Sequence, residues 1–231
     1  MKTIVISGTS KGIGKELALY YIANNYQVVG LARSKASIEH SNYFHLVCDI
    51  AIESEIVSAI KQIKKIYKTI DVLINNAALA NMNHMLTTPY DSLKKVTEVN
   101  FFGTYILSRE VAKQMIKQKR GRIINFTSIS AALHLETQSV YAATKAAIES
   151  LTKTSAKELG PFNITVNAIG PTPMDMGLIK GIPDQWLENV VNMQTIKRHG
   201  KLKDITHTLD FLISDDADFI TGQVIYLGGI S

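Results

Sequence analysis

Short apolar runs alternate along the chain with longer segments in which apolar residues recur at helical spacing. Several short runs are apolar at consecutive positions, as expected for strands buried on both faces. The predicted strands are Thr3–Ser7, Gln27–Ala32, Phe44–Cys48, Val72–Asn75, Arg122–Thr127, Ile164–Ile169 and Val224–Leu227. The predicted helical segments are 13–24, 52–67, 91–119, 139–159 and 204–213. This alternation predicts an α/β fold, a doubly wound parallel sheet of about seven strands with helices on both faces.

The domain organisation follows from what interrupts this pattern. There is no internal repeat, low-complexity tract or Pro/Gly/Ser-rich linker, so we expect one domain over residues 1–231. The least regular stretch is 170–203, which holds Pro171, Pro173 and Pro183. A long, weakly periodic segment inside a compact domain is often a lid or binding segment. We therefore expect residues 171–203 to cover a substrate site.

Charge and hydropathy exclude several classes of protein. Lys and Arg number 25 against 20 Asp and Glu, a net charge of +5. The basic residues are scattered except for a cluster at Lys113–Arg122, which lacks any nucleic-acid-binding motif and reads as a solvated helix end. No apolar stretch approaches the roughly 20 residues of a membrane helix, and the amino-terminal run is too short for a secretion signal. We expect a cytoplasmic protein with no nucleic-acid or membrane partner.

Metal and hydrolase chemistry also lack support. The single cysteine, Cys48, excludes an internal disulfide and a Cys-based zinc site. No Gly-x-Ser-x-Gly hydrolase turn is present. The six histidines show no metal-ligand spacing, and we interpret each as a surface or cap residue. They are His40, His45, His84, His134, His199 and His207.

A glycine-rich turn joins the first strand to the first helix, with Gly8, Gly12 and Gly14 in a Gly-x-x-x-Gly-x-Gly pattern. Glycines permit a tight turn and a close approach of the backbone to a phosphate, and the helix N-terminus adds free N–H groups. A P-loop needs Gly-Lys-Ser/Thr after four residues. Here Gly14 comes one residue late and Glu16 replaces the hydroxyl, which disfavours a nucleotide hydrolase.

Further motifs follow the glycine turn at fixed places. They are Asp49 after the third strand, Asn75–Ala78, Val99–Gly103, Ser128 with Tyr141 and Lys145, Ile220–Gln223 and Gly228–Gly229. Together with the turn they resemble the short-chain dehydrogenase/reductase family over nearly the whole chain. The resemblance implies a Rossmann-like fold and a nicotinamide-dependent oxidoreductase.

The resemblance also implies which residues form the site. The catalytic set is Asn100, Ser128, Tyr141 and Lys145. The cofactor-binding set is Gly8, Ser10, Lys11, Gly12, Ile13, Gly14, Arg33, Asp49, Asn76, Ala77, Tyr141, Lys145, Pro171 and Met174. No metal is implied. In the family, Asn100 holds a water that connects Lys145 to solvent. A helix-bending Asn bonded to backbone is the alternative role, and the two are compatible.

The Tyr-x-x-x-Lys element occurs twice, as Tyr90/Lys94 and Tyr141/Lys145. Only the second pair has a serine, Ser128, at the end of a predicted strand thirteen residues earlier. The first pair is interpreted as a solvated helix face. In the second, a cation one helical turn from the phenol favours the phenolate and lowers a pKa that is ordinarily about 10. The residue types thus suit proton transfer to a carbonyl oxygen, with the serine stabilising the developing charge.

Residues after the second strand predict the cofactor. An NAD site usually has an Asp or Glu at this strand end, where Ala32 stands. Arg33 follows, and Lys11 lies inside the glycine turn. A 2′-phosphate suits such basic groups, so we predict NADP(H).

Four positions depart from the family pattern, and the first, Ser7 in place of a Thr, keeps the hydroxyl. Ala78 and Thr172 stand where the family commonly has Gly, and Met176 stands where it has a Thr that bonds the nicotinamide carboxamide. One cofactor hydrogen bond worth about 1 kcal/mol is therefore expected to be missing.

The substrate prediction rests on the lid and on charge. Apolar residues of the lid suit an acyl chain, and they are Leu178, Ile179, Ile182, Trp186, Leu187, Val190, Val191 and Met193. The pattern most resembles reductases of 3-oxoacyl groups on acyl carrier protein, and Lys119 stands at one of their two basic docking positions. Phe162 occupies the other. The alternatives are a carbonyl reductase or alcohol dehydrogenase for another small metabolite, and a cofactor-binding regulator without catalysis.

An oligomer is also expected. The segments 91–119 and 139–159 carry apolar residues at helical spacing, and in the family these helices pair across a two-fold axis. The residues are Val111, Met115, Ile116, Ala147, Ile148, Leu151 and Leu159. A homodimer or homotetramer follows if they face a second copy, and ordinary core burial is the alternative.

Overall fold

Seven parallel strands form a single sheet in the order β3-β2-β1-β4-β5-β6-β7. This computed structural model describes residues 1–35, 37–175 and 184–230. The strands are β1 Thr3–Ser7, β2 Gln27–Ala32, β3 Tyr43–Val47, β4 Val72–Asn75, β5 Gly121–Phe126, β6 Ile164–Gly170 and β7 Val224–Tyr226. The predicted α/β fold is confirmed, with strand ends within one residue of the prediction.

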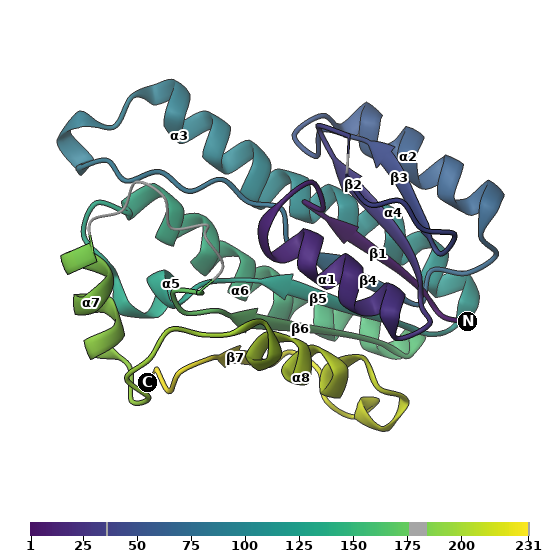
Figure 1. Cartoon of the computed structure of the whole chain (residues 1–231). Helices are drawn as coiled ribbons and strands as arrows, with labels where there is room; N and C mark the ends of the chain where they lie inside the picture. The colour runs from purple at the N-terminus through teal and green to yellow at the C-terminus, as the bar shows by residue number, and fades with distance from the viewer. Residues whose placement is uncertain (36, 176–183, 231) are drawn as a thin grey trace.

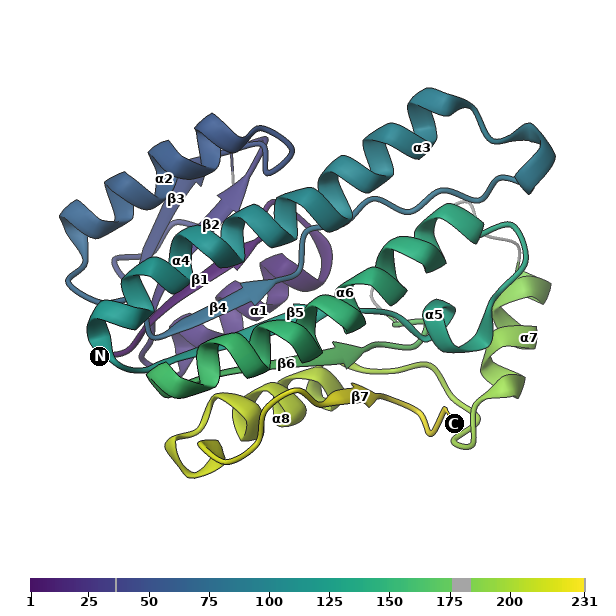
Figure 2. The same ribbon diagram turned by 180° about the vertical axis from the view of Figure 1, so that it is seen from behind.

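Helices cover both faces of the sheet (Figures 1 and 2). Helices α1 Gly12–Ala23 and α8 Leu202–Ile213 lie on one face, and α2 Glu53–Ile66, α4 Thr104–Gln118 and α6 Ser139–Leu159 lie on the other. Each face has its own apolar core because the central strands are buried on both sides. Val111, Met115 and Ile148 are buried within one chain. For these three residues, ordinary core burial rather than contact with a second copy is therefore confirmed.

The predicted helix 91–119 is divided by a change of helical register. It begins as α3, Tyr90–Thr97, continues as a π-helical segment at Glu98–Gly103, and ends as α4. A π-helical turn widens the helix locally, and such turns are frequent at functional sites. The π-helical segment joins α3, which projects from the molecule, to α4, which packs on the sheet (Figure 2).

Among the described residues, the helices that the sequence did not predict are α5 Ile129–Leu133 and α7 Asp184–Met193. Single 3₁₀ turns also occur at Met85–Thr87, Gly160–Phe162 and Asp215–Ala217. α5 follows β5 directly, whereas α7 lies inside the predicted lid and buries Leu187 and Val190. α7 stands at the left end of the molecule in Figure 1, far from β3 and α2.

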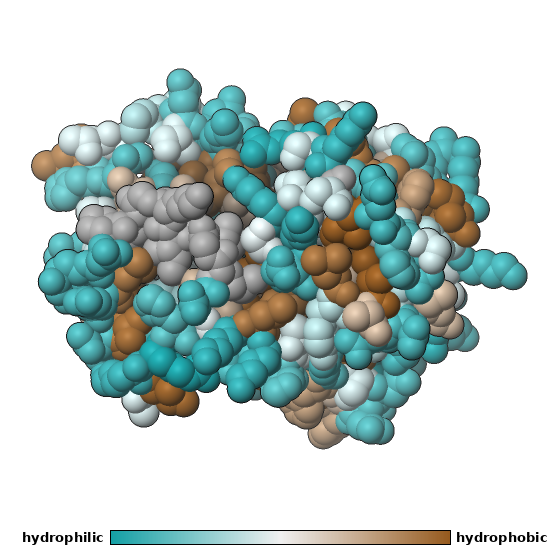
Figure 3. Space-filling model, viewed as in Figure 1, coloured by the Kyte–Doolittle hydropathy of each residue, from teal (hydrophilic) through white to brown (hydrophobic). Residues whose placement is uncertain are grey.

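The surface is largely hydrophilic on the side shown in Figure 3, and hydrophobic side chains gather there in a few separate patches. In the basic cluster Lys113–Arg122, Lys113 pairs with Glu110 and Arg120 pairs with Asp71. Among the described helices, none combines the length and apolar character needed to cross a bilayer.

Candidate active site

The site lies at the carboxyl edge of the sheet, where the strand order reverses between β1 and β4. Open parallel sheets bind ligands at such a switch point. A cavity of about 790 Å³ opens there. The cavity is lined by all but two of the predicted site residues, namely Gly8, Ser10, Lys11, Gly12, Ile13, Arg33, Asp49, Asn76, Ala77, Ser128, Tyr141, Lys145, Pro171 and Met174. Gly14 and Asn100 lie outside its lining.

The glycine turn is shaped by close backbone contacts. Gly8 has φ +82°, and a Cβ on it would lie 2.8 Å from Asn76 Nδ2. A Cβ on Gly14 would lie 2.3 Å from the carbonyl oxygen of Gly8. Ser7 Oγ accepts hydrogen bonds from the backbone N–H groups of Asn76 and Ala77, which ties the ends of β1 and β4 together. A side chain at Gly14 would therefore collide with the backbone of the turn, although Gly14 itself does not line the cavity.

The N-terminus of α1 is suited to hold a phosphate-bearing dinucleotide. Its N-cap residue, Lys11, makes no capping hydrogen bond, so the first N–H groups of the helix keep their donors available beside the cavity. The positive end of the helix dipole and the Lys11 ammonium both favour a phosphate. Arg33 lines the same cavity beside the end of β2, where the dinucleotide implied by the sequence would place its adenosine, so this part is called the adenosine end of the cavity. These residues fit the dinucleotide implied by the sequence.

Ser128, Tyr141 and Lys145 meet at the other part of the cavity. Ser128 follows the last residue of β5 by two positions and caps α5, where its Oγ accepts a 3.2 Å hydrogen bond from Ser130 N. Tyr141 and Lys145 stand one turn apart on α6, with Lys145 Nζ 5.6 Å from the centre of the Tyr141 ring. Tyr90, in the competing motif, is 74% exposed on α3, as a solvated helix face predicts.

Burial affects the two titrating groups in opposite directions. Lys145 is 3% exposed, and its Nζ donates a 2.6 Å hydrogen bond to the carbonyl oxygen of Phe126. Desolvation lowers the pKa of Lys145 to about 8. Desolvation raises the pKa of Tyr141, and a hydrogen bond with Ser128 opposes that rise. The net shift of the Tyr141 pKa in this structure is upward because of burial, and its lowering by Lys145 stays a prediction.

Asn100 joins two segments behind the cavity. It lies in the π-helical segment and is 1% exposed. Its Oδ1 accepts from Leu79 N at 2.8 Å, and its Nδ2 donates to Leu79 O at 2.9 Å and to Thr144 Oγ1 at 3.1 Å. The backbone-bonded role is thus observed, and Asn100 fixes the segment after β4 against the helix that carries Lys145.

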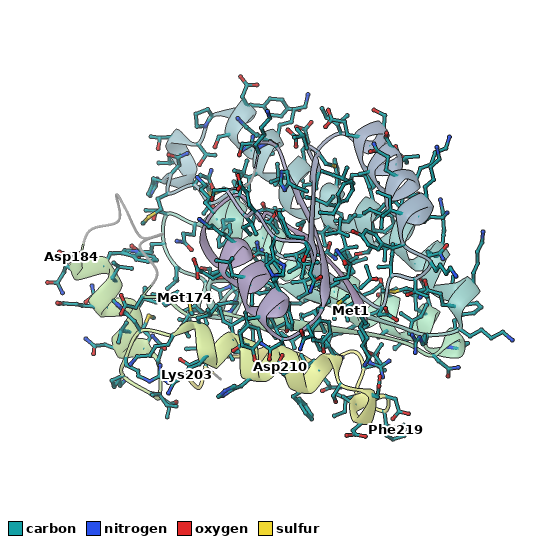
Figure 4. All side chains as sticks on the ribbon, turned by 45° about the vertical axis from the view of Figure 1, so that its right-hand side comes forward. Met1, Met174, Asp184, Lys203, Asp210 and Phe219 are labelled. Carbon is teal, nitrogen blue, oxygen red and sulfur yellow. The ribbon has the colours of Figure 1, made fainter. Side chains whose placement is uncertain are left out.

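The lid contributes apolar side chains. Trp186, Leu187 and Val190 of α7 line the cavity, whereas Met193 is 54% exposed. The predicted lid residues Leu178, Ile179 and Ile182, and the departure at Met176, lie outside the described residues. Met174 and the first residue of α7, Asp184, lie on the same side of the molecule in Figure 4.

Gln138 is a cavity residue that the sequence reasoning missed. It precedes α6, is buried and lines the cavity near Tyr141, and among the described residues its Oε1 has no hydrogen-bond partner. Its position three residues before Tyr141, at the start of the same helix, was the available signal, since residues three apart on a helix share a face.

A carrier protein that docks at the mouth of the site would need Lys119 near the cavity, but within one chain Lys119 does not line it. Lys119 caps the end of α4 and stands two residues before β5. It therefore lies at the amino edge of the sheet, opposite the cavity, because α4 returns from the carboxyl end of β4 to the start of β5.

Comparisons with known proteins agree with this geometry. A family model described as Enoyl-(Acyl carrier protein) reductase matches residues 8–230. A 3-oxoacyl-[acyl-carrier-protein] reductase of Staphylococcus epidermidis is 35% identical over 242 residues, covering 99% of this chain and 98% of that protein. The chain therefore belongs to the short-chain dehydrogenase/reductase family and is an oxidoreductase of that family.

Solved structures of similar proteins hold either nicotinamide cofactor. An NAD⁺-bound xylitol dehydrogenase has a TM-score of 0.91 and 25% identity, covering 99% of this chain and 98% of that one. ElxO with NADP bound has a TM-score of 0.90 and 27% identity, covering 98% and 96%. Both nicotinamide cofactors thus occur among similar structures, so any choice between them in this chain depends on its own residues.

Proposed function

We propose that this protein is an NADPH-dependent oxidoreductase that reduces a carbonyl group to an alcohol. The observation that carries the proposal is that Ser128, Tyr141 and Lys145 line the same cavity as the glycine turn. A nicotinamide dinucleotide bound by that turn would supply the hydride.

The three side chains have separate roles in this proposal. The Tyr141 hydroxyl donates its proton to the substrate oxygen as negative charge develops there. The Ser128 hydroxyl hydrogen-bonds the same oxygen and stabilises that charge. The Lys145 ammonium, which lies beside the Tyr141 ring, favours the phenolate left behind. Asn100 is a positioning residue for this helix.

Charge at the adenosine end supports NADPH. Ala32 ends β2 without a carboxylate, and Arg33 and Lys11 line the cavity nearby. A 2′-phosphate carries close to two negative charges and pairs well with a guanidinium. The ratio of kcat/KM with NADPH to that with NADH tests this choice, and a preference for NADH contradicts it.

The apolar lid supports an acyl substrate, and we favour a 3-oxoacyl group carried by acyl carrier protein. Trp186, Leu187 and Val190 offer apolar surface for such a chain. The experiment is NADPH oxidation with acetoacetyl-carrier protein, acetoacetyl-coenzyme A, small ketones and sugars. An advantage for the carrier protein supports the assignment. Equal rates with both thioesters, or a faster small ketone or sugar, assign a different carbonyl substrate. Absence of turnover with every substrate favours a cofactor-binding regulator.

A homodimer or homotetramer is part of the proposal. Phe102 and Tyr105 leave 50% and 47% of their surface exposed where the π-helical segment meets α4. Exposed aromatic side chains of this kind are typical of protein interfaces. Sedimentation should show an oligomer at micromolar concentration, and a monomer would contradict this part.

A further inference from the structure

Two residues of the edge strand β3, Tyr43 and His45, connect both sides of the adenosine end of the cavity. Tyr43 Oη and Thr9 Oγ1 are joined by a 3.1 Å hydrogen bond. Tyr43 Oη is also 3.0 Å from His45 Nδ1, and His45 Nε2 is 3.0 Å from the carbonyl oxygen of Ser34. A continuous chain of hydrogen bonds, called the hydrogen-bond chain below, therefore runs from Thr9 through Tyr43 and His45 to Ser34.

The sequence makes room for this chain at one position in β2. A Cβ on Gly30 would lie 2.2 Å from Tyr43 Oη and 2.4 Å from Thr9 Oγ1. Gly30 pairs directly with His45 in the sheet. The missing side chain lets the Tyr43 phenol cross over β2 and reach the glycine turn.

The direction of each hydrogen bond follows from the carbonyl group of Ser34 at one end of the hydrogen-bond chain. Because the carbonyl of Ser34 can only accept, His45 Nε2 carries a hydrogen. Burial lowers the pKa of His45 below its ordinary value, so the neutral ring leaves Nδ1 to accept from the Tyr43 hydroxyl. The Thr9 hydroxyl then donates to Tyr43. Every member of the chain is satisfied in this arrangement.

Both ends of the hydrogen-bond chain lie beside the groups that would bind the 2′-phosphate. Thr9 is fully buried between Gly8 and Ser10 in the glycine turn. Ser34 follows Arg33, and both line the cavity. On the outer side, Lys15 Nζ donates a 2.8 Å hydrogen bond to Ser37 Oγ.

We propose that Tyr43 and His45 are positioning residues that hold the Arg33–Ser34 backbone against the glycine turn, so that the Arg33 side chain is directed to the 2′-phosphate. The proposal rests on the NADPH assignment above. Neither residue needs to touch the cofactor. A backbone that is already fixed before binding loses less conformational entropy when the phosphate binds. This smaller entropy loss would increase the affinity for a ligand with a 2′-phosphate.

The test measures binding of 2′,5′-ADP and 5′-AMP to the full chain by calorimetry. His45→Leu removes both ring hydrogen bonds. It should weaken 2′,5′-ADP by about three- to tenfold, the range expected for a net hydrogen bond or two, and leave 5′-AMP within about twofold. His45→Gln can still donate to Ser34 and should recover most of the loss. Tyr43→Phe removes one oxygen, keeps the ring packing, and should act like His45→Leu if that variant is too unstable to measure.

The matched control is His40→Leu, an exposed histidine that precedes the same strand, which should leave both affinities unchanged. If the wild type prefers 2′,5′-ADP and the His45 and Tyr43 variants retain that preference, this inference is overturned and the NADPH assignment stands. An equal loss for both ligands also overturns it, since that indicates general disruption. If the wild type shows no preference, the NADPH assignment fails and the inference fails with it.

Discussion

Lys145 places its ammonium 5.6 Å from the centre of the Tyr141 ring while hydrogen-bonding the carbonyl oxygen of Phe126. This distance is within the range of a cation–π interaction. Burial favours the neutral form of both side chains, raising the pKa of Tyr141 and lowering that of Lys145 to about 8. The strand end that carries Phe126 therefore fixes where the cation sits relative to the phenol.

Removal of the Tyr141 hydroxyl should abolish turnover and leave cofactor binding nearly intact. Tyr141→Phe lacks the proton donor, and general acid catalysis is worth about 10²–10⁴-fold in rate. Steady-state kinetics and NADPH fluorescence titration measure the two effects. Tyr90→Phe changes the other Tyr-x-x-x-Lys element, on the exposed face of α3, and should behave as wild type. A wild-type rate in Tyr141→Phe would show that another group donates the proton.

The pH dependence should show one limb set by Lys145. Its pKa is lowered to about 8, so the side chain is protonated below that pH and loses its charge as the pH rises through it. We expect kcat/KM for NADPH, at saturating carbonyl substrate, to fall above about pH 8, because this parameter reports the free enzyme.

The matched variant for this limb is Lys145→Arg. A guanidinium stays protonated over the whole range, so whatever activity remains should lack the limb near pH 8. Persistence of the same limb in Lys145→Arg assigns it to a different group.

The sheet could be predicted because its strands are buried on both faces and so carry consecutive apolar residues. The change of register at Asn100 could not, because the partners of its side chain, Leu79 and Thr144, are 21 and 44 residues away in sequence. Helix α5 has only five residues and depends on the Ser128 cap, so it leaves no periodic pattern.

The histidines show that residue roles that depend on distant parts of the sequence could not be predicted for the site either. His84 and His134 are helix caps, as predicted, the first accepting from Leu86 N and the second in the left-handed region at φ 51°. His45 is half-buried, and its hydrogen-bond partners Tyr43 and Ser34 lie 2 and 11 residues away, while Thr9, at the end of the same hydrogen-bond chain, lies 34 residues from Tyr43. A one-letter pattern cannot reveal that Gly30 opens the path for this chain.

A side chain at Gly8 should destabilise the protein and weaken cofactor binding. Gly8→Ala would place a Cβ 2.9 Å from Ala77 Cα at φ +82°. The left-handed backbone and the overpacking together should cost about 2–3 kcal/mol in the free energy of unfolding. Gly160→Ala is the control, since a Cβ there meets nothing within 4 Å, and it should change stability by about 0.5 kcal/mol or less. Urea unfolding compares the two, and equal stabilities would show that the turn tolerates a side chain.

A charge reversal at Arg33 should change the choice of cofactor. Arg33→Asp removes the guanidinium beside the cavity and supplies a carboxylate, which repels a 2′-phosphate and can accept hydrogen bonds from ribose hydroxyls. Loss of a charged hydrogen bond is worth about tenfold to hundredfold, so the ratio of kcat/KM for NADPH over NADH should fall by at least that factor. Lys153→Asp makes the same change in net charge at an exposed position on α6, and its ratio should equal that of the wild type. An unchanged ratio in Arg33→Asp would mean that Arg33 points to solvent and that Lys11, or another group, reads the phosphate.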